Sequence, residues 1–461
     1  MDIIKILQHQ KNYFKSNITK PFAFRKEHLK KLKKNIKALE SEFAEALQKD
    51  LGKSEVESFI SETGFLYPEI DHTLANLKEW MQEKPVNTPL AHFPTSSYYT
   101  YQPKGIVLNI SPWNYPVNLS LAPLVAAIAA GNCTVLKPSE FTPYTNEVLK
   151  KLVKNTFNSG HVSIIEGEGH IVIPEMMQNF RFDHIFFTGS TSVGKIIAVE
   201  AAKQLVPYTL ELGGKSPCII DETANLKVAA KRIVFGKFLN AGQTCVAPDY
   251  LIVHKNVFTQ LVDYLKKEIE NFYGKNPISS KNYGKIINQK QFDRLISYLD
   301  EGEILFGKSK EQYQDNSTNL KVFPTLIKPN PNSKLIEDEI FGPILPVLTY
   351  QNEEEVFEMI EKSPNPLSLY VFSKNKSFTN WCINNIPFGG GCVNNTIIHL
   401  ANPNLPFGGV HQSGFGKYHG FEGFKELSNL KSISKTSSSI DIPLRYPPYS
   451  NFKEKVIKLF F

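Results

Sequence analysis

The segments Gly105-Ile-Val-Leu-Asn-Ile110, Pro116 to Ala130 and Cys133-Thr-Val-Leu-Lys137 decide the fold of this chain. The first and last are short and apolar, as buried strands are, whereas the middle one is long and rich in Ala and Leu, as helices are. A helix that joins two neighbouring strands of one sheet makes them parallel. The sequence therefore predicts an α/β fold with a doubly wound parallel sheet. The alternation continues through Thr145 to Phe157, Val162 to Ile165 and His184 to Phe187.

The composition is that of a soluble globular protein with more than one domain. The chain has 461 residues, of which 41% are hydrophobic and 21% charged, too long for one ordinary core. Its net charge is +7. Part of that excess lies between Arg25 and Lys34, at helical spacing opposite Leu29, Leu32 and Ile36. This pattern favours a solvated surface helix, and we expect no nucleic-acid partner.

The cysteines and the apolar segments indicate which cellular compartment to expect and whether the chain inserts into a membrane. The five cysteines, at positions 133, 218, 245, 382 and 392, are odd in number and form no Cys-x-x-Cys pair. We therefore expect a reducing, cytoplasmic location and neither disulfides nor a metal site. The N-terminus lacks a small-residue cleavage site, so no signal peptide is expected. The apolar run Leu119 to Ala130 is shorter than the roughly 20 residues of a membrane span, which predicts no stable membrane insertion.

Polar residues follow the first two predicted strands, where ligands of parallel sheets bind. Asn114 lies between Pro112 and Pro116, and its amide is either a donor to a developing oxyanion or a turn or helix cap. Lys137 and Glu140 follow the second strand. They either hold the hydroxyls of a ribose or lie in a solvated loop.

The segment Thr188-Gly-Ser-Thr-Ser-Val-Gly-Lys195 has two interpretations. It nearly completes a phosphate loop, with Cys218-Ile-Ile-Asp221 as the partner strand of a nucleotide hydrolase or kinase. Ile196, however, stands where that loop needs a Ser or Thr hydroxyl for Mg²⁺. The other interpretation is a strand-to-helix turn whose glycines let the backbone approach a dinucleotide pyrophosphate.

Two further residues are candidates for catalysis. Glu211 lies between two leucines and before two glycines. Apolar neighbours there would raise the pKa of its carboxyl toward that of a useful general base, whereas an exposed edge-strand position would leave it a surface charge. Cys245 follows a predicted helix that ends near Phe238 and lies in a turn-rich segment. It is either a nucleophile presented to a cleft or a small core residue.

Six motifs follow one another along the chain: Pro112-Trp-Asn114, Phe187-Thr-Gly-Ser-Thr191, Glu211-Leu-Gly-Gly-Lys215, Gly242-Gln-Thr-Cys245, Glu339-Ile-Phe-Gly-Pro343 and Leu405-Pro-Phe-Gly-Gly409. In wording, order and spacing they resemble the aldehyde dehydrogenase superfamily, from about residue 20 to 435. The segment from Gln243 to Tyr250 and the tail Arg445-Tyr-Pro-Pro-Tyr-Ser450 are similar to the class 3 branch of that family.

The resemblance implies NAD(P)-dependent oxidation of an aldehyde, of medium chain length or aromatic, to the carboxylic acid. Cys245 would attack the aldehyde, Asn114 would hold the oxyanion, and Glu211 would activate the water that hydrolyses the thioester. Members of the family that form acyl-CoA generally lack that glutamate. The resemblance does not distinguish NAD from NADP. It implies these cofactor-binding residues: Trp113, Lys137, Glu140, Gly189, Ser190, Gly194, Leu212, Glu339 and Phe341.

The resemblance also implies how the chain is divided. Residues 1–83 and 104–211 would form the dinucleotide-binding domain, and residues 212–421 a second α/β domain that carries the nucleophile. Residues 84–103 and 422–440 would form a small β oligomerisation element, and residues 441–461 a C-terminal tail. Class 3 relatives are typically dimers, so we expect a homodimer.

Overall fold

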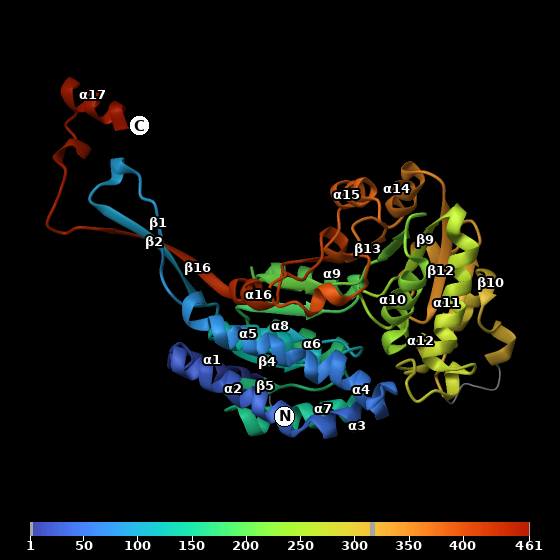
Figure 1. Ribbon diagram of the computed structural model, residues 1–461. Helices are drawn as coiled ribbons and strands as arrows, with labels where there is room; N and C mark the ends of the chain where they lie inside the picture. Colours follow the sequence, from blue (N-terminus) through green and yellow to red (C-terminus); the bar gives the residue numbers. More distant parts are fainter. Residues whose placement is uncertain (1–2, 314–318, 461) are drawn as a thin grey trace.

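The computed structural model describes residues 3–313 and 319–460, which form three β-sheets with helices around them (Figure 1). Met1, Asp2 and Phe461, at the ends of the predicted domains, lie outside the described residues. In Figure 1 the blue-to-green part and the yellow-to-orange part form two α/β bodies, and a β arm extends away from the first of them.

The six-stranded sheet confirms the predicted parallel α/β fold. Its strands run in the order β15-β7-β6-β3-β4-β5, and every neighbouring pair except β15 and β7 is parallel. Chain order reverses between β3 and β6, which is where open α/β sheets bind ligands at the carboxyl ends of their strands. The strands are β3 Ile106–Ile110, β4 Cys133–Lys137, β5 Val162–Ile164, β6 His184–Thr188, β7 Tyr208–Glu211 and β15 Gly414–Phe415.

Different helices cover the two faces of this sheet, as in a doubly wound fold. Alternate strand residues point to opposite faces. Val107, Leu136 and Phe186 pack in one core with α6 (Asn118–Ala130) and α7 (Pro143–Thr156). Leu108, Val135 and Ile185 pack in a second core with α1 (Ile3–Lys15), α8 (Gly169–Asn179) and α9 (Thr191–Lys203). The N-terminal helices α2 (Phe22–Ala38), α3 (Glu40–Leu51) and α5 (Gly64–Trp80) lie over α6 and α7.

The second body is built on a seven-stranded sheet of order β10-β11-β12-β9-β8-β13-β14, parallel except for β10. Its strands are β8 Pro217–Ile220, β9 Tyr250–His254, β10 Gly302–Phe306, β11 Thr325–Pro329, β12 Ile344–Tyr350, β13 Ser368–Phe372 and β14 Gly390–Val393. Its helices are α10 Leu226–Phe238, α11 Phe258–Tyr273, α12 Gln289–Ser297, α13 Lys334–Glu337, α14 Glu353–Glu361 and α15 Lys376–Asn385. The mixed α/β architecture predicted for this half of the chain is therefore present.

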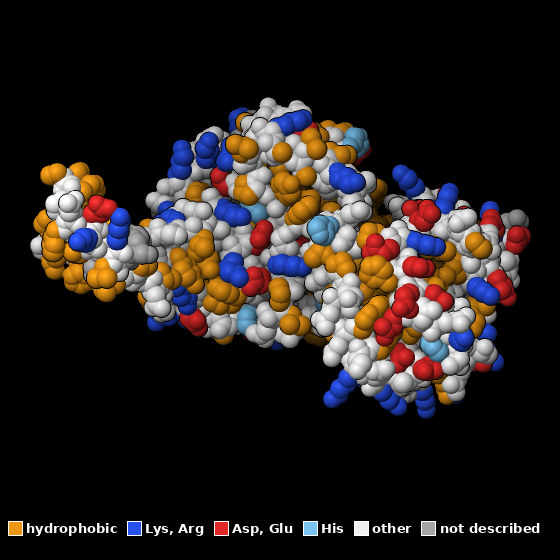
Figure 2. All heavy atoms as spheres, turned by 90° about the horizontal axis from the view of Figure 1, so that it is seen from above, with side chains coloured by type: hydrophobic (Ala, Val, Ile, Leu, Met, Phe, Trp, Pro, Cys, Tyr) orange, Lys and Arg blue, Asp and Glu red, His pale blue; other side chains and the backbone are white. Residues whose placement is uncertain are grey.

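The arm joins two segments that lie far apart in the sequence. β2 (Thr95–Pro103) pairs along its whole length with β16 (Ser428–Thr436) and also with β1 (Lys84–Val86), all antiparallel. α16 (Gly420–Glu426) precedes β16, and α17 (Asn451–Phe460) lies at the far end of the arm (Figure 1). Hydrophobic side chains gather at that end in Figure 2. Among the described residues, no helix is both long enough and apolar enough to cross a membrane.

Candidate active site

Two cavities meet at the carboxyl ends of the six-stranded sheet. The larger, of about 740 Å³, is lined by residues that directly follow β3, β4, β6 and β7, and by Cys245, Glu339 and Phe341 from the second half of the chain. The smaller, of about 250 Å³, lies beside it and is mostly apolar. Cys245 and Glu211 line both cavities. The side chains of Cys245 and Glu211 are therefore accessible from both cavities.

Cys245 lies on a tight loop that begins where α10 ends. Asn240 and Ala241 adopt left-handed backbone angles, with φ of 52° and 51°. Gly242 follows with a φ of 77°, and a Cβ there would lie 2.3 Å from the Gly342 carbonyl oxygen, so no larger residue fits. The Cys245 thiol is partly exposed to the cavities. Burial, and then the nearby carboxyls of Glu339 and Glu211, raise its pKa to about 12.

Asn114 is 3% exposed, and hydrogen bonds hold both its main-chain oxygen and its side-chain amide. Its Nδ2 donates to the main-chain oxygen of Gln243 at 3.0 Å, which leaves the second N–H of the amide for a ligand. Both Asn114 and Cys245 line the larger cavity. The loop after β3 thus places an amide donor in the same cavity wall as the thiol, and Asn114 is more than a turn residue.

Glu211 ends β7 and is 3% exposed. β7 is not the edge strand of the sheet, because β15 pairs with it on the side away from β6. Glu211 is therefore not a surface charge on an exposed edge. Neither carboxylate oxygen has a hydrogen-bond partner in the part of the chain that the structure describes. Burial raises the pKa of Glu211 well above its usual value, Lys417 opposes the shift, and Glu426 adds to it. A buried carboxylate without partners, facing a cavity, is a candidate proton acceptor.

The larger cavity suits a dinucleotide in size and in the chemistry of its walls. Lys137 and Glu140 lie in its wall after β4, where Lys137 Nζ is 3.4 Å from a Glu140 oxygen. Gly189 and Ser190 line it at the start of α9, and the Ser190 hydroxyl accepts from Val193 N at 3.4 Å. A helix N-terminus in that place suits a pyrophosphate.

The other predicted cofactor residues also line the larger cavity, with one exception. Trp113 and Phe341 form an edge-to-face pair with ring centroids 5.4 Å apart. Glu339 is half-buried, and desolvation, then the charge of Asp249, raises its pKa to about 8. Leu212 lines the cavity wall, but Gly194 does not. A Cβ on Gly194 would meet Leu212 Cδ2 at 2.5 Å, so this glycine lets α9 approach β7 instead of contacting a ligand.

The phosphate-loop interpretation of residues 189–195 is wrong. Lys195 is exposed on α9 and does not line the larger cavity. Asp221, its supposed partner, follows β8 of the other sheet, where its carboxylate accepts from Ser373 Oγ at 2.7 Å. A nucleotide hydrolase needs the lysine and the aspartate around one phosphate and its Mg²⁺. Here Lys195 lies on α9, which packs on the six-stranded sheet, and Asp221 follows β8 of the seven-stranded sheet.

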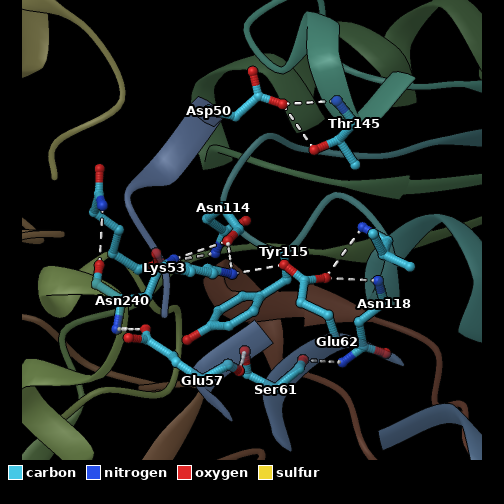
Figure 3. A network of polar contacts seen from close by, with 12 residues as sticks. Asp50, Lys53, Glu57, Ser61, Glu62, Asn114, Tyr115, Asn118, Thr145 and Asn240 are labelled. Atoms are coloured by element: carbon cyan, nitrogen blue, oxygen red, sulfur yellow. Dashed lines mark hydrogen bonds and ion pairs between the residues drawn. The ribbon is translucent and has the colours of Figure 1, made fainter. Parts of the chain in front are cut away.

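The structure adds residues that the sequence did not reveal. A buried cluster of Lys53, Glu57 and Glu62, from the helical N-terminal region, contacts the loops of Asn114 and Asn240 (Figure 3). Nothing in the sequence indicated this cluster, because buried lysines and glutamates have the same spacing as those of a surface helix.

A second buried group supports the loop of Glu339 and Phe341. Lys215 Nζ lies 2.7 Å from Asp249 and donates to the Asp338 oxygen at 2.8 Å. Asp249 also accepts from Ile340 N at 3.2 Å. Lys215 ends the motif Glu211-Leu-Gly-Gly-Lys215, and Asp249 lies in the segment from Gln243 to Tyr250. These motifs were the available signal, although neither residue was predicted to belong to the site.

Residues 1–433 match the Aldehyde dehydrogenase family. The chain belongs to that family. It is 47% identical over 454 residues to the 4,4'-diaponeurosporen-aldehyde dehydrogenase of Staphylococcus aureus, covering 98% of this chain and 97% of that one. It is 38% identical over 452 residues to the mouse dimeric, NADP-preferring aldehyde dehydrogenase, covering 97% of this chain and 98% of the relative.

The fold agrees with that membership. The solved structure of a substrate-bound state of Staphylococcus aureus AldH superimposes with a TM-score of 0.94 at 46% identity, covering 99% of this chain and 98% of the other. The chain is therefore an NAD(P)-dependent aldehyde dehydrogenase, similar to the class 3 branch. The predicted family, enzyme class and cofactor are confirmed.

Proposed function

We propose that this enzyme oxidises neutral, apolar aldehydes to carboxylic acids by covalent catalysis on Cys245, with Asn114 as oxyanion donor and Glu211 as general base. The observation that carries the proposal is that Cys245 and Glu211 line both the dinucleotide-sized cavity and the apolar one. A covalent intermediate on this sulfur faces the cofactor on one side and the substrate channel on the other.

The first step is attack of the Cys245 sulfur on the aldehyde carbon. The thiol gives its proton to solvent water, the thiolate sulfur forms a C–S bond, and the carbonyl π electrons move onto the oxygen. The free N–H of the Asn114 amide and the main-chain N–H of Cys245 are the donors for that oxyanion. The bond from Asn114 to Gln243 O holds the amide plane before substrate arrives.

We assign cofactor binding to residues in the walls of the larger cavity. Lys137 and Glu140 would hold the ribose on the adenine side, Gly189 and Ser190 the pyrophosphate, and Glu339 the ribose on the nicotinamide side, with Trp113, Leu212 and Phe341 as apolar walls. When bound, the nicotinamide supplies the acceptor for the hydride that leaves the aldehyde carbon, and the carbon is left as a thioester on Cys245.

Glu211 completes the reaction. As a carboxylate it takes a proton from water, the water oxygen attacks the thioester carbon, and the C–S bond breaks to release the acid. Neither oxygen has a hydrogen-bond partner among the described residues, so both are available to that water. Its raised pKa makes it a stronger base than an exposed glutamate.

The substrate class follows from the smaller cavity. Apolar side chains form most of its wall, among them Phe65, Phe235 and Leu400. His419 also lines it, but burial lowers its pKa to about 3, so that ring is neutral. A charged substrate would find no counter-ion among the described residues that line this cavity apart from Glu211 at its inner end, which supports medium-chain aliphatic or aromatic aldehydes.

The decisive test is turnover of purified enzyme with NAD⁺ or NADP⁺ and a series of aldehydes, followed by formation of reduced cofactor. We expect higher kcat/KM for uncharged aliphatic and aromatic aldehydes than for phosphorylated or carboxylated ones. Cys245→Ser is expected to abolish the signal. Unchanged turnover in that variant would remove Cys245 from the mechanism.

We also propose a homodimer in the cytoplasm. The arm exposes apolar side chains over its outer part, including Leu90 at 71% and Phe452 at 69%, and apolar surface of this kind is typical of a protein interface. The printed name of the mouse relative calls that protein dimeric. Five free cysteines suit a reducing compartment. Sedimentation velocity of the full chain is the test of the dimer.

The domain division remains part of the proposal. Residues 1–83 and 104–211 form the unit that holds the cofactor, and residues 212–421 the unit that holds Cys245. Residues 84–103 and 422–440 form the arm, and residues 441–461 the tail. Within this division β15 (Gly414–Phe415) crosses from the second unit to pair with β7 of the first, so the units share one sheet edge.

A further inference from the structure

A buried ion pair lies behind the Asn114 loop. Lys53 Nζ is 2.6 Å from Glu62 Oε1, and both side chains are 0% exposed. Lys53 is in the turn between α3 and α4 (Glu55–Ser58), and Glu62 is in the π-helical turn Phe59–Thr63. Neither residue lines the two cavities. The pair is therefore not a binding site for the aldehyde or the cofactor.

The ion pair holds both ends of the segment that carries Asn114 (Figure 3). Lys53 Nζ donates to the Asn114 carbonyl oxygen at 3.0 Å and lies 4.0 Å from the centroid of the Tyr115 ring. Glu62 Oε2 accepts from the main-chain N–H groups of Val117 at 3.1 Å and Asn118 at 2.9 Å. Charge-assisted bonds at both ends of a five-residue segment restrict how its backbone can rotate.

The same cluster reaches the loop of the nucleophile. Glu57 Oε1 accepts from Asn240 N at 2.7 Å, where the backbone is left-handed. The Asn240 side chain then donates to Asn114 O at 2.8 Å and to Gln243 O at 3.2 Å. Gln243 O is also the acceptor of the Asn114 amide. The carbonyl of Asn114 is thus fixed jointly by Lys53 and Asn240, two residues from opposite sides of the site.

Stability alone is a weak reason for such a cluster. Removing two charges from water costs more than many buried ion pairs return, and well-packed apolar residues often stabilise a protein as well or better. A fixed network of charged hydrogen bonds does, however, define one geometry for the groups that it holds. Here those groups are the oxyanion donor and the loop of the attacking thiol.

We propose that Lys53, Glu57 and Glu62 are positioning residues that hold the Asn114 amide in register with Cys245 for oxyanion stabilisation. This inference rests on the proposed roles of Asn114 and Cys245. The cluster acts through Asn114 and touches neither substrate nor cofactor. Loss of the cluster therefore slows the chemical step while cofactor binding and the thiol itself are retained.

The main variant is Lys53→Met combined with Glu62→Gln. It removes both charges of the ion pair together, so neither Lys53 nor Glu62 is left unpaired, and the amide oxygen of the introduced glutamine remains an acceptor for the N–H groups of Val117 and Asn118. The buried Glu57 loses the nearby charge of Lys53, which raises its pKa further, and keeps its hydrogen bond from Asn240 N. We expect kcat to fall about 10- to 100-fold, the range for a small displacement of a catalytic group. The KM for NAD⁺, the binding of reduced cofactor by fluorescence, and the alkylation rate of Cys245 by iodoacetamide are expected to stay within about threefold. Alkylation needs no oxyanion donor.

Asp50→Asn is the matched control. Asp50 is a buried carboxylate on the preceding helix, but it accepts from Thr145 N and Oγ1 at 2.8 and 2.7 Å, away from Asn114 (Figure 3). We expect it to lower thermal stability and leave kcat within about twofold. If kcat falls in this control as much as in the Lys53 and Glu62 double variant, the effect is general loosening and the proposal is overturned.

Asn240→Gly keeps the proposal testable if the double variant does not fold. Glycine accepts the left-handed backbone and removes only the side-chain amide that donates to Asn114 O and Gln243 O. A fall in kcat of about tenfold, with cofactor binding unchanged, supports the proposal. Full activity in either folded variant overturns it.

A double-mutant cycle separates this inference from the proposed mechanism. If the cluster acts through the Asn114 amide, the Lys53 and Glu62 changes have little further effect on kcat in an Asn114→Ala background. If Asn114→Ala lowers kcat but the two losses multiply, the positioning role is wrong and the role of Asn114 stands. If Asn114→Ala alone leaves kcat unchanged, its proposed role fails, and this inference fails with it.

Discussion

The side-chain amide of Asn114 donates to the main-chain oxygen of Gln243 at 3.0 Å, although 129 residues separate them in the sequence. This bond joins the loop after β3 to the loop that carries Cys245, and it orients one N–H of the amide while leaving the other free. The Asn114 side chain therefore helps to align the two halves of the candidate site, together with the bond from Asn240 Nδ2 to Asn114 O.

Asn114→Ala is expected to lower kcat about 10²- to 10³-fold, the usual cost of losing one oxyanion donor. Steady-state rates over a range of aldehyde concentrations are the measurement. Asn394→Ala is the control, because Asn394 bonds the main chain of Ser373 at 2.9 Å through both ends of its amide and lines neither cavity. Equal losses of kcat in both variants would contradict a specific role for Asn114.

Glu211→Gln is expected to separate the two half-reactions. Reduced cofactor should appear in a rapid burst close to one equivalent per site, followed by turnover about 10²- to 10⁴-fold slower, because no base activates the water. Mass spectrometry of the quenched enzyme is then expected to find the acyl group on Cys245. Normal turnover without a trapped acyl-enzyme would count against Glu211 as the base.

The pH dependence of hydrolysis follows from the same carboxyl. Its pKa lies well above the usual value, so lowering the pH protonates it and removes the base, and raising the pH restores the carboxylate. Single-turnover hydrolysis of the thioester in the wild-type enzyme is expected to speed up with rising pH, over a window above the usual titration range of a glutamate. Glu211→Gln should lose that dependence, and an identical pH profile in the variant would show that another group titrates.

Alkylation of Cys245 by iodoacetamide, without cofactor, tests the state of the thiol. Burial and two nearby carboxyls raise its pKa to about 12, so the reactive thiolate is a small fraction near neutrality and grows as the pH rises. We expect the alkylation rate to increase several-fold per pH unit, with no plateau below about pH 10. Cys245→Ser supplies the background from other cysteines. A plateau near neutrality would mean a much lower thiol pKa.

Glu140→Gln is expected to shift the enzyme toward NADP⁺. Glu140 Oε1 accepts from Gly169 N at 3.0 Å, beside Lys137, and its negative charge would repel a 2′-phosphate. Because the side chain is 32% exposed, solvent weakens that repulsion, and the ratio of kcat/KM for NADP⁺ over NAD⁺ should rise only about three- to tenfold. Glu166→Gln, a carboxylate that pairs with Lys150 outside the larger cavity, should leave the ratio unchanged.

Much of the fold followed from local pattern. In the segments of β3, α6 and β4, the pattern of apolar residues and the flanking turn residues indicated two strands and a helix. The polar residues that follow β3 and β4 do line the larger cavity, as expected. Gly194 was the exception among the predicted cofactor residues. Its place in a glycine motif suggested ligand contact, but the space it leaves is filled by Leu212.

The sequence by itself determined the alternation of strands and helices, the family motifs, and the identity of Cys245, Glu211 and Asn114 as candidates, because these depend on residue type and short spacing. Only the tertiary structure decided that Cys245 and Glu211 share two cavities, that Lys195 on α9 and Asp221 after β8 lie beside different sheets, and that Lys53, Glu57 and Glu62 contact the loops of the site. Those relations arise from contacts between segments far apart in the chain. No periodicity encodes them, since a buried lysine and a surface lysine look the same until the helices have packed.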